Sequence, residues 1–190
     1  MLIERKTVYF EEKGPKNTDE TLRLAKERAE ALGINDIVIA SYSGHSGAKA
    51  SQIFENYNLV VVAGVVGFKE PNKVAMLQEY RNTIEKNGGK VIHAGHAFGM
   101  LGRAINKKFG AIQVDEVIAN VLRLFSSGVK VGCEISCMAA DAGLIVAGKE
   151  TVAIAGTAKG SDSAIVIKPS NTHTFFDTRI LEIICKPRQW

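Results

Sequence analysis

The chain has 190 residues, which fits one domain over residues 1–190. Its 46% hydrophobic and 23% charged residues are typical of soluble globular proteins and exclude disordered and fibrous chains. The net charge of +4 comes from mixed basic and acidic residues without a basic stripe, so it favours anionic small molecules over nucleic acid. No apolar window approaches the ~18 residues of a membrane span, and the charged N-terminus does not resemble a secretory signal. We therefore expect no membrane partner and a cytoplasmic location. The three cysteines, an odd number, fit reduced thiols in such a compartment.

The first predicted elements are a helix, a strand and a second helix. Residues 17–32 have apolar positions at helical spacing; Asn17 and Glu20 form a capping-box pattern at the start and Gly33 follows the end. Residues 37–40 form a short apolar run typical of a strand buried on both faces. A Ser/Gly loop follows, and a helix is predicted over residues 47–56.

The same alternation continues through the next third of the chain. A strand is predicted over residues 59–63, a helix from Pro71 to the glycines at 88–89, and a strand over residues 90–93. Strands that alternate with helices indicate βαβ units with a mostly parallel sheet. We therefore predict an α/β fold, a three-layer α/β/α sandwich.

The rest of the chain is expected to complete the third layer and one edge of the sheet. Residues 100–145 have helical periodicity throughout. After Gly148, β-rich runs at residues 151–155, 164–167 and 179–185 have no helix between them. We expect these C-terminal strands to be antiparallel neighbours at one edge.

The loop between the first predicted strand and the next helix is a candidate phosphate site. It contains Ser41, Ser43, Gly44, His45, Ser46 and Gly47. Ligands of open α/β folds bind at the carboxyl ends of strands, and a helix N-terminus offers unpaired N–H donors with partial positive charge. The alternative is a Ser/Gly turn that only caps the helix.

Two segments resemble the C-terminal domain of pyruvate kinase. Residues 37–47 are similar to the strand and T-x-S/T-G-x-[ST]-A loop that, in that family, grips a phosphate of the allosteric effector. Residues 148–163 resemble its G-D-x-V-x-V-x-x-G strand and G-x-T-N turn, the other lip of that site, although Asp162 and Ser163 depart from the Thr-Asn pair. Residues 68–142 do not match the family.

The chain most closely resembles archaeal stand-alone proteins of the pyruvate kinase C-terminal-domain-like family, and this resemblance implies bound flavin mononucleotide (FMN). The loops after the second and third strands could flank a flat ring. The remaining candidate ligand-binding residues are Gly64, Gly67, His96, Gly156, Thr157, Lys159, Gly160 and Asp162. Lys159 could approach the phosphate or be an exposed turn lysine.

Other chemistry is weakly indicated. His93, His96, Cys133 and Cys137 could be drawn as a zinc site, but both cysteines fall within a helical pattern, and we predict no metal. A nucleophile could be imagined at Cys137 or Ser46, with His45 or His96 as its base. No sequence motif of a nucleophilic enzyme accompanies these residues. Glu134 and Asp141 are seven residues apart on one predicted helix face. They could be a pair for acid–base catalysis or simply belong to a solvent-exposed face.

Three functions follow as expectations. The first is a binding protein for a phosphorylated small molecule such as FMN. The second is a flavin-dependent oxidoreductase on the same site. The third is a homo-oligomeric regulatory or interaction module. Pyruvate kinase activity is not expected, because its TIM barrel needs ~250 residues.

Overall fold

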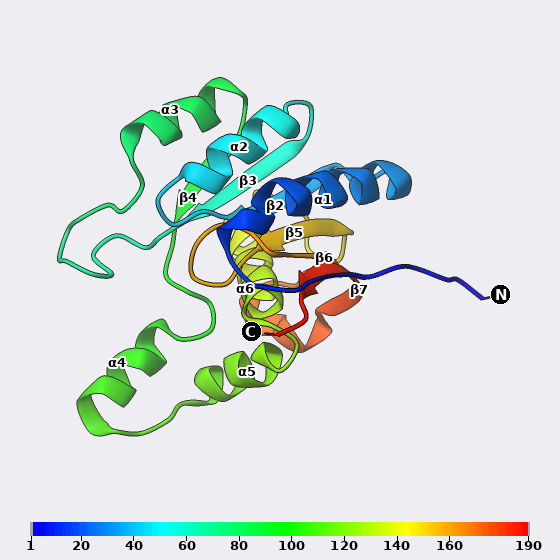
Figure 1. The fold of residues 1–190 in the computed structure, drawn as a ribbon. Helices are drawn as coiled ribbons and strands as arrows, with labels where there is room; N and C mark the ends of the chain where they lie inside the picture. Colours follow the sequence, from blue (N-terminus) through cyan, green and yellow to red (C-terminus); the bar gives the residue numbers. More distant parts are fainter. Residues whose placement is uncertain (1, 190) are drawn as a thin grey trace.

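The computed structural model describes residues 2–189, which contain one seven-stranded sheet of order β1-β7-β6-β5-β2-β3-β4 (Figure 1). The elements in chain order are β1 (Val8–Phe10), η1 (Pro15–Asn17), α1 (Thr18–Leu32), β2 (Asp36–Ala40), α2 (His45–Ile53), β3 (Asn58–Ala63), α3 (Gln78–Lys86), β4 (Lys90–His93), α4 (Met100–Phe109), α5 (Val114–Arg123), α6 (Ser127–Asp141), β5 (Thr151–Ala155), β6 (Ser163–Lys168), η2 (Thr172–Asp177) and β7 (Arg179–Pro187). None of the helices in this part of the chain combines the length and apolarity needed to cross a bilayer.

Most neighbouring strands are parallel. β2 pairs in parallel with β3 and with β5, β3 with β4, and β1 with β7. β6 is antiparallel to β5 and to β7. The predicted α/β class with a mostly parallel sheet and antiparallel C-terminal strands on one side is confirmed. β5 itself lies in the middle of the sheet beside β2, where all five of its residues are buried.

Helices cover both faces, so the predicted three layers are confirmed. One core cluster joins α1 and α2 to the sheet, with Leu22, Phe54 and Ile154 buried within it. α6 packs against the opposite face through Ile135 and Met138. Figure 1 shows α1, α2 and α3 on one side of the sheet and α6 on the other.

Glycine sets how closely α2 approaches the sheet. A Cβ at Gly47 would lie 2.7 Å from Val61 Cγ1 of β3. Real Cβ atoms do not approach that closely, so a larger residue here would push the helix away from the strand. Gly47 therefore has a packing role that is separate from any ligand.

One predicted helix cap is absent, and one predicted helix start is wrong. α1 begins as expected, but Asn17 makes no capping bond: its side-chain amide donates to the Glu12 carbonyl at 2.7 Å. The helix predicted from Pro71 begins only at Gln78, because Asn72 has a φ of 61°, a left-handed conformation that no helix contains. Pro71 lies in the preceding loop.

The helical region at residues 100–145 is three helices, and one strand was missed. Gly110, with a φ of 70°, ends α4, and Ser126 caps α6 by accepting the Val129 N–H at 3.0 Å. Of these three helices only α6 lies directly on the sheet, while α5 packs on α6 and α4 on α5.

The strand that the sequence did not predict is β1. It has three residues and pairs with β7 at the sheet edge; so short a run carries no periodicity.

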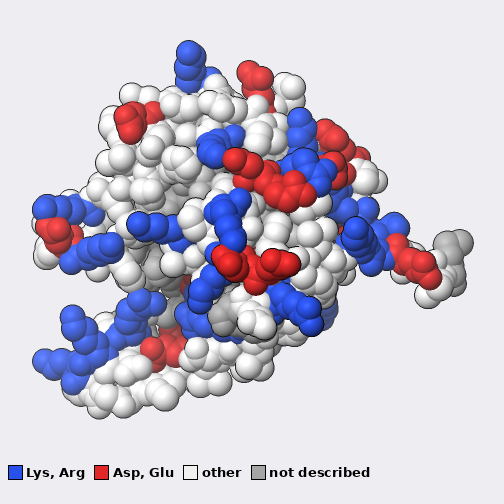
Figure 2. Space-filling model, in the orientation of Figure 1, with Lys and Arg blue, Asp and Glu red and all other residues white. Residues whose placement is uncertain are grey.

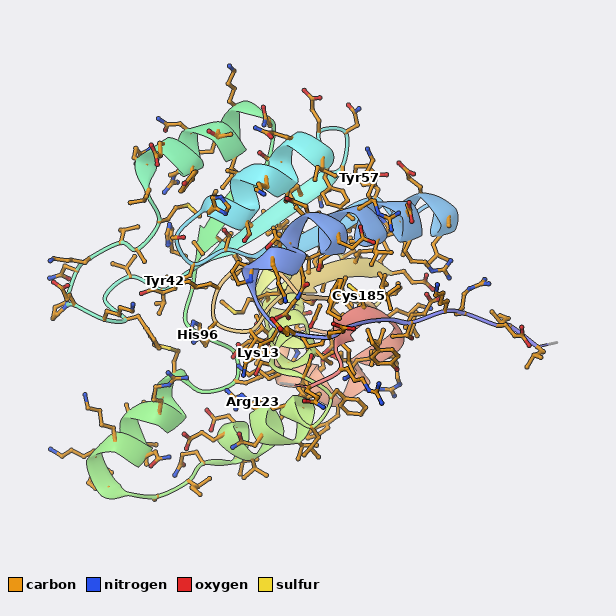
Figure 3. The ribbon with its side chains drawn as sticks, in the orientation of Figure 1. Lys13, Tyr42, Tyr57, His96, Arg123 and Cys185 are labelled. Atoms are coloured by element: carbon orange, nitrogen blue, oxygen red, sulfur yellow. The ribbon has the colours of Figure 1, made fainter. Side chains whose placement is uncertain are left out.

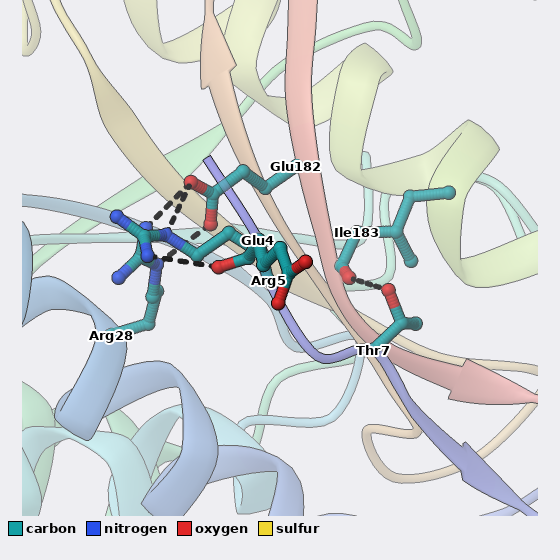
Figure 4. Close-up of polar contacts among 6 residues, drawn as sticks. All are labelled: Glu4, Arg5, Thr7, Arg28, Glu182 and Ile183. Carbon is teal, nitrogen blue, oxygen red and sulfur yellow. Dashed lines mark hydrogen bonds and ion pairs between the residues drawn. The ribbon is translucent and has the colours of Figure 1, made fainter. Parts of the chain in front are cut away.

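An ion pair fastens α1 to β7 (Figure 4). The Arg28 guanidinium donates two hydrogen bonds of 2.6 Å to the Glu182 carboxylate, and Arg5 lies 3.9 Å from the same carboxylate. Thr7 adds a hydroxyl bond of 2.9 Å to the Ile183 carbonyl. The Arg28 hydrogen bonds, strengthened by the charges of Arg28 and Arg5 and opposed by burial, hold the pKa of Glu182 below its ordinary value.

Glu182→Gln is expected to lower the free energy of unfolding by about 1–2 kcal/mol at pH 7, because a charge-assisted pair becomes a neutral one. Since the folded pKa is depressed, this contribution is present above the ordinary glutamate pKa and is lost as pH falls through the folded pKa. Urea unfolding of both proteins from pH 7 downward should show the difference shrinking. Glu20→Gln, which removes an exposed pair with Arg23, is the control and should cost no more than about 0.5 kcal/mol.

Candidate functional site

The two loops predicted to form the site lie side by side, although they are far apart in the sequence. We call them the two lips of the site: residues 41–47 after β2 and residues 156–162 after β5. β2 and β5 are parallel neighbours, with Ile39 paired to Ile154, so the loops that follow them leave the same edge of the sheet. From β2 the chain continues to β3 and β4 on one side, whereas β5, β6 and β7 lie on the other. Ligands of open α/β sheets bind where the strand order reverses in this way.

Internal contacts hold the loop after β2 in one shape. The Ser41 hydroxyl accepts the Gly47 N–H at 2.9 Å, and the Ser43 carbonyl accepts the Leu77 N–H at 3.0 Å. Gly44 has a φ of 101°, and a Cβ there would lie 2.6 Å from Tyr80 Cβ. The loop is therefore preorganised, and Ser41 contributes by shaping it.

The first turn of α2 offers unpaired donors to this edge. Within residues 2–189 the backbone N–H groups of His45 and Ser46 donate to no protein acceptor. The helix dipole adds partial positive charge at the same place. Ser46 is buried and Ser43 exposed, while the His45 ring is exposed and packs edge-on against Tyr80, with centroids 5.6 Å apart. Unpaired N–H groups at a helix N-terminus are what an anion such as phosphate binds.

The lip after β5 is tightly folded. A Cβ at Gly156 would lie 2.3 Å from the Gly160 carbonyl oxygen, so the loop turns directly back on itself. Asp162 is fully buried and accepts hydrogen bonds from the N–H groups of Gly14 and Thr157 and from the Ser163 hydroxyl. Asp162, expected as a ligand residue, thus anchors the lip to the rest of the fold.

Two hydroxyls in this lip are buried without a partner. Thr157 Oγ1 and Ser161 Oγ have no hydrogen-bond partner among the described residues. Burying an unpaired hydroxyl costs free energy that a bound group could recover. Lys159, between them in the sequence, is exposed. This is consistent both with a lysine that approaches a phosphate and with an ordinary turn lysine.

Aromatic rings lie at a third side of the candidate site, near the loops that follow β3 and β4. The Tyr42 ring covers Gly64, where a Cβ would meet it at 2.4 Å. Phe68 packs against His96 with centroids 5.3 Å apart, and the Arg103 guanidinium lies 5.1 Å from the Phe68 centroid. Figure 3 shows Tyr42 and His96 toward the same end of the molecule. Gly67, also expected at the site, takes a φ of 80° in a local turn, where its N–H donates to the Lys73 carbonyl.

A buried ion pair supports the loop that carries His96. Lys130 and Glu134 are 4% exposed each and join at 2.5 Å, and Glu134 also accepts the Phe98 N–H at 3.0 Å. Burial lowers the pKa of the Lys130 ammonium, and Glu134 opposes this shift. Burial also lowers the pKa of His96; Glu134 opposes that shift, while Lys130 and Arg103 add to it. Burial and these two cations therefore favour the neutral form of the His96 imidazole.

The other chemistries considered from the sequence find no support in the side-chain geometry. Within the described residues, no three His, Cys, Asp or Glu side chains form a group that could hold a metal ion. Burial raises the pKa of Cys137 to about 11, which opposes a nucleophilic role. Glu134 and Asp141 do not share a solvated face, since Glu134 is buried while Asp141 accepts hydrogen bonds from Asn171 and Thr172.

Basic residues predominate on one side of the candidate site. α4 contains Arg103, Lys107 and Lys108 and no acidic residue, and the loop opposite contains Lys69 and Lys73. Figure 2 shows Lys and Arg on both sides of a hollow between these parts of the surface. A hollow of about 570 Å³ lies elsewhere, at the amino end of β2, lined by residues such as Lys26, Glu30 and Tyr57.

Arg103 and Lys130 were not identified from the sequence. Lys130 had a signal that could have been used: it is four residues before Glu134 in a helix that otherwise contains only one charged residue, Asp141. Arg103 had none, because its contact with Phe68 depends on where α4 lies relative to the loop after β3.

Fold and site together define an open α/β protein with unpaired backbone N–H groups at the carboxyl edge of its sheet. No protein-family model matches the chain. Among solved structures, it is similar to Cryptosporidium parvum pyruvate kinase in complex with ADP at 14% identity and a TM-score of 0.39, over 88% of this chain and 23% of that one. It is also similar to a mutant of O-ureido-L-serine synthase with bound O-ureido-L-serine, at 18% identity and a TM-score of 0.32 over 66% of this chain and 47% of that one. The chain thus spans less than half the length of either protein, and both likenesses are weak.

Proposed function

We propose that the chain binds a phosphorylated small molecule at the carboxyl edge of its sheet, with the phosphate on the first turn of α2. The observation that carries this proposal is the pair of unpaired N–H groups at His45 and Ser46 in a loop held rigid by Ser41. The unpartnered Thr157 hydroxyl in the adjacent lip supports it. A loop that served only to cap the helix would not account for a buried hydroxyl without a partner in the loop after the neighbouring strand.

Flavin mononucleotide is the ligand we propose within this class. The resemblance of residues 37–47 and 148–163 to the pyruvate kinase C-terminal domain and its archaeal stand-alone relatives suggested it, and the residues present fit its two chemical parts. The α2 N-terminus suits the phosphate, while Tyr42, Phe68 and His96 offer aromatic surface for a flat ring. The free thiols of all three cysteines suit the cytoplasmic location proposed with this ligand.

A flavin-dependent oxidoreductase is the second candidate function. The observation that favours it is the half-buried His96 ring packed against Phe68, with the Arg103 guanidinium over that phenylalanine and the Lys130–Glu134 pair under the same loop. A flavin would supply hydride or electron transfer, and the protein's part would be to position it and to tune its charge. His96 could hold a proton at a ring nitrogen, and the two cations would favour negative charge at the site.

The first experiment is an absorbance spectrum of the purified protein, followed by mass spectrometry of whatever denaturation releases. Flavin bands with the mass of the mononucleotide would support the proposed ligand, and bleaching by a reduced nicotinamide would favour the oxidoreductase. A colourless protein that releases or binds a sugar phosphate would support the proposed phosphate site and contradict the proposal that its ligand is FMN. Calorimetric titrations with FMN, sugar phosphates and inorganic phosphate that all show no binding would contradict the proposal itself.

A further inference from the structure

α4 and α5 form an arm that projects from the body of the protein. We define the arm as residues 100–125, which comprise both helices and the segments that follow them. Figure 1 shows it extending away from the sheet, next to α6 at one end. The contacts of α5 with α6 attach the arm to the body.

The two helices of the arm face each other through polar groups. The Asn106 side chain donates to both carboxylate oxygens of Glu116, at 2.9 and 3.0 Å. Gly102 lies so close to Asp115 that a Cβ there would be 2.3 Å from its Oδ1. Two packed helices normally bury their apolar stripes against each other. In this arm half-buried polar groups lie between the two helices.

Many of the large apolar side chains of the arm are consequently exposed. Of the twenty large hydrophobic residues exposed within residues 2–189, eight lie on the arm. They are Leu101, Phe109, Ile112, Val114, Val117, Val121, Leu124 and Phe125. Five of the eight, including Leu101 and Phe109, are between 71% and 76% exposed, and none of the eight is less than 49% exposed. Monomers rarely expose contiguous apolar patches beyond a few hundred Å².

The size of this surface matches what a dimer needs. Eight half-exposed to mostly exposed side chains of this size present roughly 1,000 Å² of apolar surface. Two such surfaces in contact would remove up to ~2,000 Å² from water, the range of stable protein–protein interfaces. None of these eight residues is charged, so the contact would bury no charge through them, while Arg103, Lys107 and Lys108 of α4 are exposed to solvent.

The pattern along α5 suits pairing with itself. Val114, Val117, Val121 and Leu124 follow one another at spacings of three, four and three residues, which places them in one stripe along the helix. A twofold axis brings the same surface of two subunits together. Two helix pairs that meet in this way make four helices around a shared apolar core.

We infer that the protein is a homodimer in which the arms of two copies pack together through the exposed apolar residues of α4 and α5. The dimer also bears on the ligand site, because Arg103 of α4 contacts Phe68 beside His96. The inference does not depend on the proposed ligand.

Sedimentation velocity on the purified full chain tests this inference. The wild-type protein should sediment as a dimer at micromolar concentration, and Val117→Glu with Val121→Glu should give a monomer, because two buried carboxylates would face their own copies. Val146→Glu, at a residue 64% exposed outside the arm, is the matched control and should remain dimeric. Far-ultraviolet circular dichroism should be unchanged in all three.

A second variant, Phe109→Ser with Ile112→Ser, makes the same test without adding charge and should weaken dimerisation at least tenfold, since it removes two large apolar contacts from each subunit. A wild-type protein that is monomeric over the accessible concentration range would overturn the inference. So would a dimer whose mass and dissociation constant are the same in both arm variants as in the wild type.

Discussion

Ser46→Asp is expected to weaken the binding of a phosphorylated ligand about 100-fold or more, which corresponds to about 2.8 kcal/mol. Ser46 lies in the first turn of α2, where its own N–H group has no protein acceptor within residues 2–189. A carboxylate at this position would accept hydrogen bonds from the free N–H groups and repel the phosphate. The fold should survive, because an acidic residue in the first turn of a helix is favoured by the helix dipole.

Two controls separate charge from position. Gln52→Glu adds the same charge to the exposed far end of α2 and should leave affinity nearly unchanged. Ser46→Ala keeps the backbone donors and should cost no more than about tenfold, the value of a single hydrogen bond. Calorimetric titration with FMN and with inorganic phosphate measures all three variants. If Ser46→Asp and the wild type bound the ligand with equal affinity, the proposal that the phosphate binds at the N-terminus of α2 would be wrong.

Glu134→Ala is expected to lower the free energy of unfolding by about 3–5 kcal/mol, because it leaves the ammonium of Lys130 buried without a partner. It also removes the acceptor of the Phe98 N–H, which holds the loop that carries His96. Urea unfolding followed by circular dichroism measures the loss.

The matched control removes both charges at once. Lys130→Met with Glu134→Leu replaces the pair by apolar residues of similar volume and should recover most of the stability, since the cost of a broken buried pair lies in the charge left behind. The Phe98 N–H stays without its acceptor in this double variant, so about 1 kcal/mol should remain lost. If the double variant were as unstable as Glu134→Ala, the ion pair would not be the cause.

The sheet and its layers could be predicted because their residues repeat with a clear period. The apolar runs at residues 37–39 and 59–63 are buried on both faces, and α1 has an apolar stripe that ends before Gly33. The start of α3 was wrong, because a residue such as Pro71 is tolerated at a helix start but does not require one. The arm could not be foreseen, since apolar periodicity at residues 100–125 indicates helices without showing what covers them.

The candidate site was predictable only in part. Its two lips were found because short Ser/Gly loops follow apolar strands, and the structure places them side by side through the pairing of β2 with β5. The role of each residue was not predictable. Ser41 and Asp162 look like ligand-binding residues in the sequence, yet their side-chain oxygens accept hydrogen bonds that hold the loops in place.

The three cysteines give each face of the sheet its own chemical reporter. Cys133 and Cys137 lie in the core between α6 and the sheet, whereas Cys185 lies in the core on the α1 side. Burial raises the pKa of Cys133 and Cys185 to about 12, so these thiols react with a labelling reagent only when the structure opens. Labelling rates resolved by peptide mapping would therefore show which layer separates from the sheet first as the protein unfolds.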